Sequence, residues 1–147
     1  MPIGSGAGVH FGNEFFNPPV PVEIPVQNFN NGGRLRLVVK PTHGDRFQIN
    51  LKTPDDIILH FSVRFDEQAI VRNSTQNGSW QNEERFGDFP FRRDHVYTIE
   101  FLSNNGVIAI LINGQPYADF LERLPGHNIH LIEISGDVHI HSAHIAH

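Results

Sequence analysis

The sequence predicts an all-β protein built as a sandwich or a barrel. Short runs rich in β-branched and aromatic residues recur about every eight to twelve residues, and no window keeps the apolar periodicity of a helix. Turn-forming residues separate these runs at 30–33, 41–45, 53–56, 77–78, 103–106, 113–114, 125–128 and 135–137. A chain of 147 residues is long enough for one domain with a single core. We therefore expect one β domain rather than two.

The first residues differ in composition from the rest of the chain. Residues 1–9 are rich in glycine and small side chains, as flexible linkers are. We expect residues 10–147 to form the domain. The start contains no basic segment followed by an apolar one, so we expect no secretory signal peptide. The protein is then expected in the cytoplasm, or outside the cell after export without a signal peptide.

Residues 46–52 and 57–65 predict two strands, each with one apolar and one polar face, because successive side chains of a strand point to opposite sides. The side chains expected to face the core are Phe47, Ile49, Leu51, Ile57, Leu59, Phe61, Val63 and Phe65. Those expected on the other face are Arg46, Gln48, Asn50, Lys52, His60, Ser62 and Arg64. Two consecutive strands therefore build one polar sheet face, where a ligand can lie.

The next run, residues 69–73, predicts a strand with one side chain in an unexpected place. Its alternation puts Asn73 on the same side as Val71, and it puts Arg72 on the side that belongs to the core. A buried arginine without a partner is costly. We expect Arg72 at a strand end or bulge, where its guanidinium group reaches water.

Glu83 and Glu84 raise the question of a glycosidase, since such enzymes place two carboxylates about 5–10 Å apart across one cleft. Adjacent residues of a strand point to opposite faces. Glu83 is therefore expected to share a face with Arg85, while Glu84 points away from it. The sequence predicts no catalytic residues and no enzyme activity.

Residues 107–112 and 115–120 predict a hairpin. Asn113-Gly114 between them is typical of a type I′ turn, which requires positive φ at both central residues. Apolar residues in the following stretch, 120–124, are also compatible with a short amphipathic helix.

Trp80, the only tryptophan of the chain, lies in the polar stretch "GSWQNEERF". Its neighbours are amides and charged residues, so we expect an exposed indole rather than a core residue. A sugar has an apolar patch of C–H groups on one ring face and hydroxyls at its rim, and it is bound by a flat aromatic group beside directional donors and acceptors. The polar face offers such partners in His60, Arg64, Asn73, Glu83 and Arg85. The pattern predicts a sugar site.

The motifs "HFSVRF", "VRN" and "WQNEER" resemble, in order and spacing, the carbohydrate-recognition signature of the galectin family. The resemblance covers residues 10–147 and implies a jelly-roll-like sandwich of two antiparallel sheets with five or six strands each. It implies binding of β-galactosides, such as lactose or N-acetyllactosamine, without metal. By this resemblance His60 and Arg64 bond the axial 4-hydroxyl of galactose, Asn73 bonds its 6-hydroxyl, Trp80 stacks under its ring, and Glu83 and Arg85 reach toward the next sugar.

The chain departs from the family pattern at Ser62, where the family has asparagine. A serine hydroxyl is shorter than an amide and cannot donate twice. We expect weaker or shifted galactoside binding. The alternative is a structural or protein-interaction module that keeps the sandwich but has lost sugar recognition. The connection "DEQA" after Arg64 is also shorter than in vertebrate members and resembles that of nematode ones.

Composition bears on several other functions. A net charge of −5 disfavours binding to phosphate backbones, which depends on cationic side chains. No apolar run approaches the ~18 residues of a membrane span. The absence of cysteine excludes disulfides and thiolate metal sites. We expect neither nucleic-acid binding nor membrane insertion.

The C-terminal histidines could suggest a metal site. His139 and His141 share one strand face, with His144 and His147 following. A metal site also needs a carboxylate or a third imidazole in reach, and no suitable residue follows. We expect no metal and no cofactor, and we interpret these histidines as the polar face of the last strand.

The expected partners are glycans, glycoproteins or glycolipids that carry β-galactosides. A shallow, water-exposed groove gives micromolar to millimolar affinity, so useful avidity requires more than one site. We expect either a homodimer or a second domain in a tandem-repeat parent.

Overall fold

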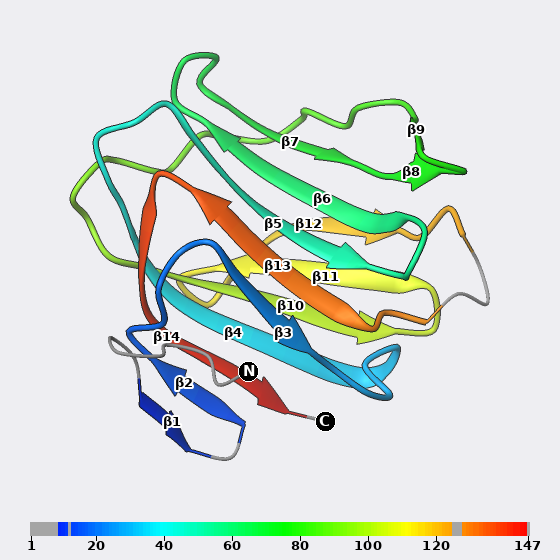
Figure 1. The fold of residues 1–147 in the computed structure, drawn as a ribbon. Coiled ribbons are helices and arrows are strands. Elements are labelled where there is room, and N and C mark those ends of the chain that lie inside the picture. Colours follow the sequence, from blue (N-terminus) through cyan, green and yellow to red (C-terminus); the bar gives the residue numbers. More distant parts are fainter. Residues whose placement is uncertain (1–8, 12, 125–127, 147) are drawn as a thin grey trace.

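The structure is a computed structural model, which describes residues 9–11, 13–124 and 128–146. Two antiparallel sheets pack face to face, with a small hairpin at one edge (Figure 1). The larger sheet has seven strands in the order β1 (Val9–Phe11), β2 (Glu14–Phe16), β14 (Val138–Ala146), β4 (Asn31–Pro41), β10 (Tyr97–Asn104), β11 (Val107–Ile112) and β12 (Gln115–Leu121). The smaller sheet has five, β3 (Val22–Pro25), β13 (Leu131–Gly136), β5 (Arg46–Lys52), β6 (Ile57–Arg64) and β7 (Ala69–Asn73). The hairpin consists of β8 (Thr75–Gln76) and β9 (Ser79–Trp80).

This architecture confirms the predicted all-β, jelly-roll-like sandwich. The larger sheet has seven strands rather than five or six, because the short strands β1 and β2 extend it beyond β14. Val9, the last residue of the expected linker, already belongs to β1, and residues 1–8 lie outside the described residues.

The core lies between the sheets and is built by the alternation of β5 and β6. Their core-facing residues, among them Phe47, Ile49, Leu59 and Phe61, have no exposed surface. Phe61 meets Phe101 of β10 edge to face, with ring centroids 5.3 Å apart. This contact joins the two sheets, so the opposite face of β5 and β6 is left for polar residues.

The alternation fails at the start of β6. Leu51 pairs with Leu59 but Lys52 pairs with Ile57, so Ile58 is an extra residue at a β-bulge. Ile58 is buried and Ile57 is only half-buried, which corrects the expectation that Ile57 faces the core. A bulge shifts the parity of the residues before it, and period-two alternation does not reveal it.

The predicted Asn113-Gly114 turn is confirmed. Its residues have φ of 51° and 78°, and Ile112 pairs with Gln115 across it. Asn105-Gly106 makes the corresponding turn between β10 and β11. Such turns join consecutive strands with the twist that a sheet requires.

The short helix considered for residues 120–124 is wrong. Phe120 and Leu121 complete β12, where they pair with Ile108 and Val107. Phe120 is buried and Leu121 is exposed, as the alternation of a strand requires. Within the described ranges no helix is long and apolar enough to cross a membrane.

Candidate functional site

A groove of about 440 Å³ lies on the polar face of β6 and β7, next to the β8–β9 hairpin. It is lined by His60, Arg64, Asn73, Trp80, Gln81 and Glu83. Most of the predicted site residues therefore meet around one hollow. Ser62 and Arg85 lie beside it rather than in its lining, and Gln81 is an addition that the sequence patterns did not single out.

Trp80 stands at the rim of the groove. Its side chain is 54% exposed, as expected from its polar neighbours. The indole lies 4.7 Å from the His60 ring, centroid to centroid, with the planes tilted by 60°. The groove therefore has an apolar aromatic surface directly beside a hydrogen-bonding imidazole.

His60 is held by a chain of hydrogen bonds across the sheet. Its Nδ1 lies 2.6 Å from Asn50 Oδ1, and the Asn50 amide donates to Glu133 at 3.0 Å. Because Asn50 Oδ1 can only accept, His60 Nδ1 is the donor, and Nε2 of the neutral ring is an acceptor. Burial, assisted by the positive charge of Arg64 and opposed by Glu83, lowers the pKa of His60 to about 4. At neutral pH His60 thus offers a hydroxyl group an acceptor, not a positive charge.

Arg64 is fixed by groups on three sides. Its Nε donates to Ser62 Oγ at 3.1 Å, its Nη1 donates to Glu67 at 3.3 Å, and Glu83 lies 3.8 Å from the same Nη1. Ser62 is only 2% exposed and lies behind Arg64. In this arrangement Ser62 helps to orient the guanidinium group and is not part of the groove's lining.

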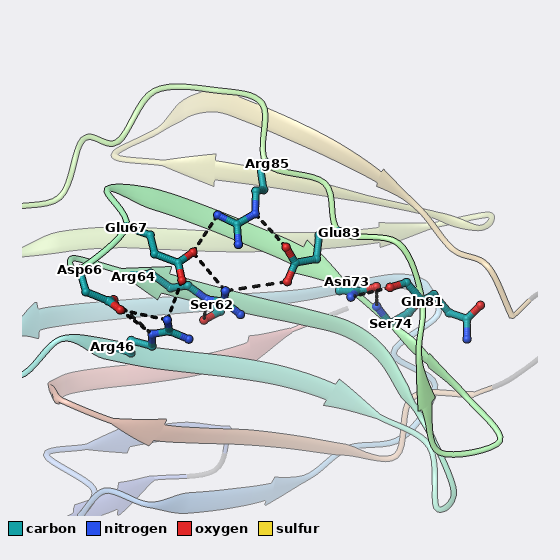
Figure 2. Close-up of polar contacts among 10 residues, drawn as sticks. All are labelled: Arg46, Ser62, Arg64, Asp66, Glu67, Asn73, Ser74, Gln81, Glu83 and Arg85. Atoms are coloured by element: carbon teal, nitrogen blue, oxygen red, sulfur yellow. Dashed lines mark hydrogen bonds and ion pairs between the residues drawn. The ribbon is translucent and has the colours of Figure 1, made fainter.

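Arginines and carboxylates alternate beside Arg64 (Figure 2). Glu83 accepts from Arg85 Nε at 2.8 Å, so it stands between two arginines as predicted. Glu67 joins the same two arginines, at 2.7 Å from Arg85 Nη1, and also accepts from Arg46 at 2.7 Å. Hydrogen bonds from Arg85 and Arg64 hold the pKa of the Glu67 carboxyl below its ordinary value.

Glu67 and Arg46 were not among the predicted site residues. Arg46 was assigned to the correct sheet face by the alternation of its strand. Glu67 lies in the turn between β6 and β7, where alternation assigns no face. The signal that could have identified Glu67 is its position in the tight connection that follows Arg64.

Asn73 is 3% exposed, and the orientation of its amide is fixed by the groups that donate to its oxygen. Its Oδ1 accepts from the Ser74 backbone N–H at 2.8 Å and from Arg123 at 3.0 Å. Its Nδ2 donates to the Gln81 carbonyl at 3.0 Å and has a second N–H. Asn73 can therefore act toward a ligand only as a donor.

Arg123 is a contributor that the sequence patterns did not reveal. It follows β12 of the larger sheet, and its guanidinium group reaches Asn73 and Ser74 and pairs with Glu84 at 2.7 Å. Glu84 thus pairs with Arg123, whereas Glu83 pairs with Arg85. This agrees with the prediction that the two carboxylates point in opposite directions. The two carboxylates do not face each other across the groove.

The expectation that Arg72 reaches water is wrong. Arg72 is 1% exposed, and its Nη1 donates to the Ile70 carbonyl at 2.7 Å. Its guanidinium group lies 4.5 Å from the Phe86 ring centroid and 5.4 Å from that of Tyr117. Aromatic rings replace water as its neighbours, and they attract the cation through their π faces. Burial lowers the pKa of Arg72.

Arg72 also attaches the segment that carries Glu83 and Arg85. Its backbone N–H and carbonyl both bond to Glu84, at 2.9 and 2.8 Å. Phe86 packs on the Arg72 guanidinium group at the end of this segment. The segment is thereby held along β7, with Glu83 on the groove side.

His139, His141 and His144 lie on β14. The rings of His139 and His141 are 4.7 Å apart, and burial, together with His141 and Lys40, lowers the pKa of His139. His147 lies outside the described residues. Among the residues that the structure describes, no group of three or more His, Cys, Asp or Glu could hold a metal ion.

Comparison with known proteins decides the family. Residues 19–145 match the family model described as galactoside-binding lectin. The chain belongs to this family. Lectins of this family bind carbohydrate without altering it covalently, so the chain is a lectin and not an enzyme.

The similar proteins include nematode and mammalian galectins. The crystal structure of Caenorhabditis elegans galectin LEC-6 has a TM-score of 0.89 and 60% identity, and the match covers 95% of this chain and 100% of that one. The 32 kDa beta-galactoside-binding lectin of Caenorhabditis elegans is 33% identical over 135 residues, which cover 90% of this chain and 48% of that lectin. Galectin-7 of Rattus norvegicus is 34% identical over 116 residues, covering 76% and 85%. The chain spans about half the length of the 32 kDa lectins.

Proposed function

We propose that this lectin binds glycans ending in β-galactose, such as lactose and N-acetyllactosamine, in the groove beside Trp80. The observation that carries the proposal is the convergence of His60, Arg64, Asn73, Trp80 and Glu83 around one hollow, in the order and spacing of the galectin signature. The groove combines an exposed aromatic face with fixed donors and acceptors. Those are the two features that a sugar ring requires.

The charge of the site favours a neutral ligand. Arg46, Arg64 and Arg85 are each paired with carboxylates, which are those of Asp66, Glu67 and Glu83. A phosphate or sulfate would have to displace these carboxylates from the arginines. A sugar hydroxyl accepts from one guanidinium N–H while the ion pairs persist.

Each side chain has a distinct role in the proposal. Arg64 donates to the axial 4-hydroxyl of galactose, and this hydroxyl donates to His60 Nε2. Asn73 donates to the 6-hydroxyl, and Trp80 stacks on the C–H face of the ring. An equatorial 4-hydroxyl would leave these groups unpaired, at a cost of about 1–3 kcal/mol, so galactose is preferred to glucose. Glu83 and Arg85 contact the following sugar.

Lactose titration by calorimetry tests the proposal, with cellobiose as the glucose-based control. We expect a lactose Kd in the micromolar to millimolar range, no measurable cellobiose binding, and loss of lactose binding in Trp80→Ala. Retention on lactose-agarose with elution by free lactose is the corresponding test for the immobilised sugar. Equal binding of both disaccharides would contradict the proposed specificity.

A second candidate is the sandwich as a protein-interaction module without sugar binding. The observation in its favour is Ser62, whose hydroxyl lies behind Arg64 where the family has an amide. This module would pass through lactose-agarose unretained, and a glycan array would give no signal. The exposed indole of Trp80 beside the groove and the ion pairs of Arg64 and Arg85 favour the lectin over the interaction module.

Multivalent binding is part of the proposal. A single shallow groove binds weakly, whereas two linked grooves raise avidity by about 10²–10⁴. Either a homodimer or a second domain in a longer parent protein can supply the second groove. Sedimentation equilibrium together with agglutination of galactose-coated beads distinguishes a dimer from a monomer.

A further inference from the structure

Trp80 lies on a hairpin that is too short to maintain its own position. β8 and β9 form only the pairs Thr75–Trp80 and Gln76–Ser79, in a two-stranded sheet separate from both large sheets. Isolated two-stranded hairpins are marginally stable at best in water. Other contacts must therefore hold the indole at the groove.

The carboxylate of Asp56 supplies these contacts. Its Oδ1 accepts from Thr75 Oγ1 at 2.8 Å and from the Gly78 N–H at 2.9 Å, and its Oδ2 accepts from the Asn77 N–H at 3.1 Å. Asn77 and Gly78 are the central residues of the turn, with φ of 53° and 78°. Asp56 is only 8% exposed, so these bonds are shielded from water.

Asp56 is itself fixed to the strand that carries His60. Its backbone N–H donates to Thr53 Oγ1 at 2.9 Å, and its carbonyl accepts from the Thr53 N–H at 2.8 Å. The next residue, Ile57, begins β6 and donates to Thr75 Oγ1 at 2.8 Å. The hairpin and β6 thus share one set of bonds, and His60 on β6 lies against Trp80.

We propose that Asp56 is the positioning residue of the Trp80 platform. Its carboxylate holds both N–H groups of the Asn77-Gly78 turn, which keeps the indole beside His60. An asparagine at this position has one acceptor oxygen, and its NH₂ group would face a backbone N–H. The expected loss of sugar affinity rests on the proposed function, whereas the expected change in the position of the indole does not.

The substitution Asp56→Asn tests the proposal, with Asp55→Asn as its matched control. Asp55 is adjacent, exposed and subject to the same loss of charge. Since Trp80 is the only tryptophan, fluorescence reports this indole alone. We expect Asp56→Asn to retain the far-ultraviolet spectrum of the wild type, to show stronger acrylamide quenching and a shifted emission maximum, and to bind lactose about tenfold more weakly. Asp55→Asn should match the wild type in all of these measurements.

Gly78→Ala is the second variant, for the case in which Asp56→Asn does not fold. Gly78 has φ of +78° and open space around an added Cβ, so alanine strains the turn without a clash and leaves Asp56 in place. We expect the same change in quenching and weaker lactose binding. Unchanged quenching and affinity in folded Asp56→Asn, or in folded Gly78→Ala, would overturn the proposal. Wild-type protein that fails to bind lactose contradicts the proposed function instead, and the quenching comparison still decides the role of Asp56.

Discussion

At the scale of single residues, His60 and Asn73 each have only one hydrogen-bonding role left toward the groove. Asn50 occupies the donor nitrogen of His60 and leaves an acceptor. Arg123 and Ser74 occupy the oxygen of Asn73 and leave a donor. A ligand that bonds both residues must therefore present a donor to His60 and an acceptor to Asn73.

The neutral state of His60 leads to a prediction about pH. Its pKa of about 4 in the folded chain lies below the ordinary value of 6.5, so protonation favours the unfolded chain. The stability that the neutral ring contributes is fully present above pH 6.5 and is lost as the pH falls from 6.5 through 4. Lactose affinity should be constant from pH 8 to about 5.5 and then fall.

Two measurements check this prediction. Proton NMR should follow the His60 ring to a midpoint near pH 4. Urea unfolding of wild type and His60→Gln at pH 7 and pH 4.5 should show a smaller stability difference at the lower pH. A His60 midpoint near 6.5 would contradict the proposed burial of a neutral ring.

Substitution of Ser62 tests the departure from the family pattern. Ser62→Asn should strengthen lactose binding by about 1 kcal/mol, because an amide can bond Arg64 and still donate toward the sugar. Ser62→Ala should weaken binding, since Arg64 Nε loses its acceptor. Calorimetry with lactose measures both, and no gain in Ser62→Asn would show that the serine does not limit affinity.

At the scale of the elements, the site is built from segments that have little regular structure of their own. Glu83 and Arg85 lie on a segment held along β7 by two backbone bonds to Arg72 and by Phe86. Arg123, which follows β12, connects Asn73 to Glu84. A residue that follows a strand of the larger sheet thus helps to fix the groove, although the groove lies on the smaller sheet.

Arg123→Met should release Asn73, Ser74 and Glu84 while the apolar stem of the side chain is retained. We expect a loss of about 1–3 kcal/mol in the free energy of unfolding, because the buried Asn73 oxygen loses a charged donor, and weaker lactose binding as the amide becomes free to rotate. Urea unfolding and calorimetry measure the two effects. Arg92→Met, at an exposed site, is the matched control and should change neither. If Arg123→Met bound lactose as tightly as the wild type, Asn73 would keep its orientation without Arg123.

At the scale of the whole molecule, one core supports the five-stranded sheet, whose outer side carries the candidate site (Figure 1). Phe61 packs into that core beneath the groove, against Phe101 of the opposite sheet. The chain has a net charge of −5, whereas the arginines beside the groove are matched by carboxylates. Charge therefore contributes to solubility more than to attraction of the ligand.

Phe101→Ala tests how far the groove depends on sheet packing. Removing this buried ring should cost about 3–5 kcal/mol of unfolding free energy through the cavity it leaves. Lactose affinity of the folded fraction should stay within about twofold, since the groove residues keep their own hydrogen bonds. Chemical denaturation and calorimetry below the melting range measure the two quantities. A large loss of affinity in folded protein would show that the core transmits its packing to the site.

The sequence by itself determined the fold class, the polar face of β5 and β6, the exposure of Trp80 and the pairing of Glu83 with Arg85. The fold class follows from the recurrence of β-rich runs between turn-forming residues. The other features follow from period-two alternation or from the polarity of near neighbours, which act over a few residues. Only the tertiary structure decided the bulge at Ile58, the burial of Arg72 under Phe86 and Tyr117, and the hydrogen bond of Ser62 to Arg64. It also decided the contributions of Glu67, Arg123 and Asp56. Most of these depend on side chains that meet from separate strands or loops, and for such contacts sequence spacing provides no measure of distance.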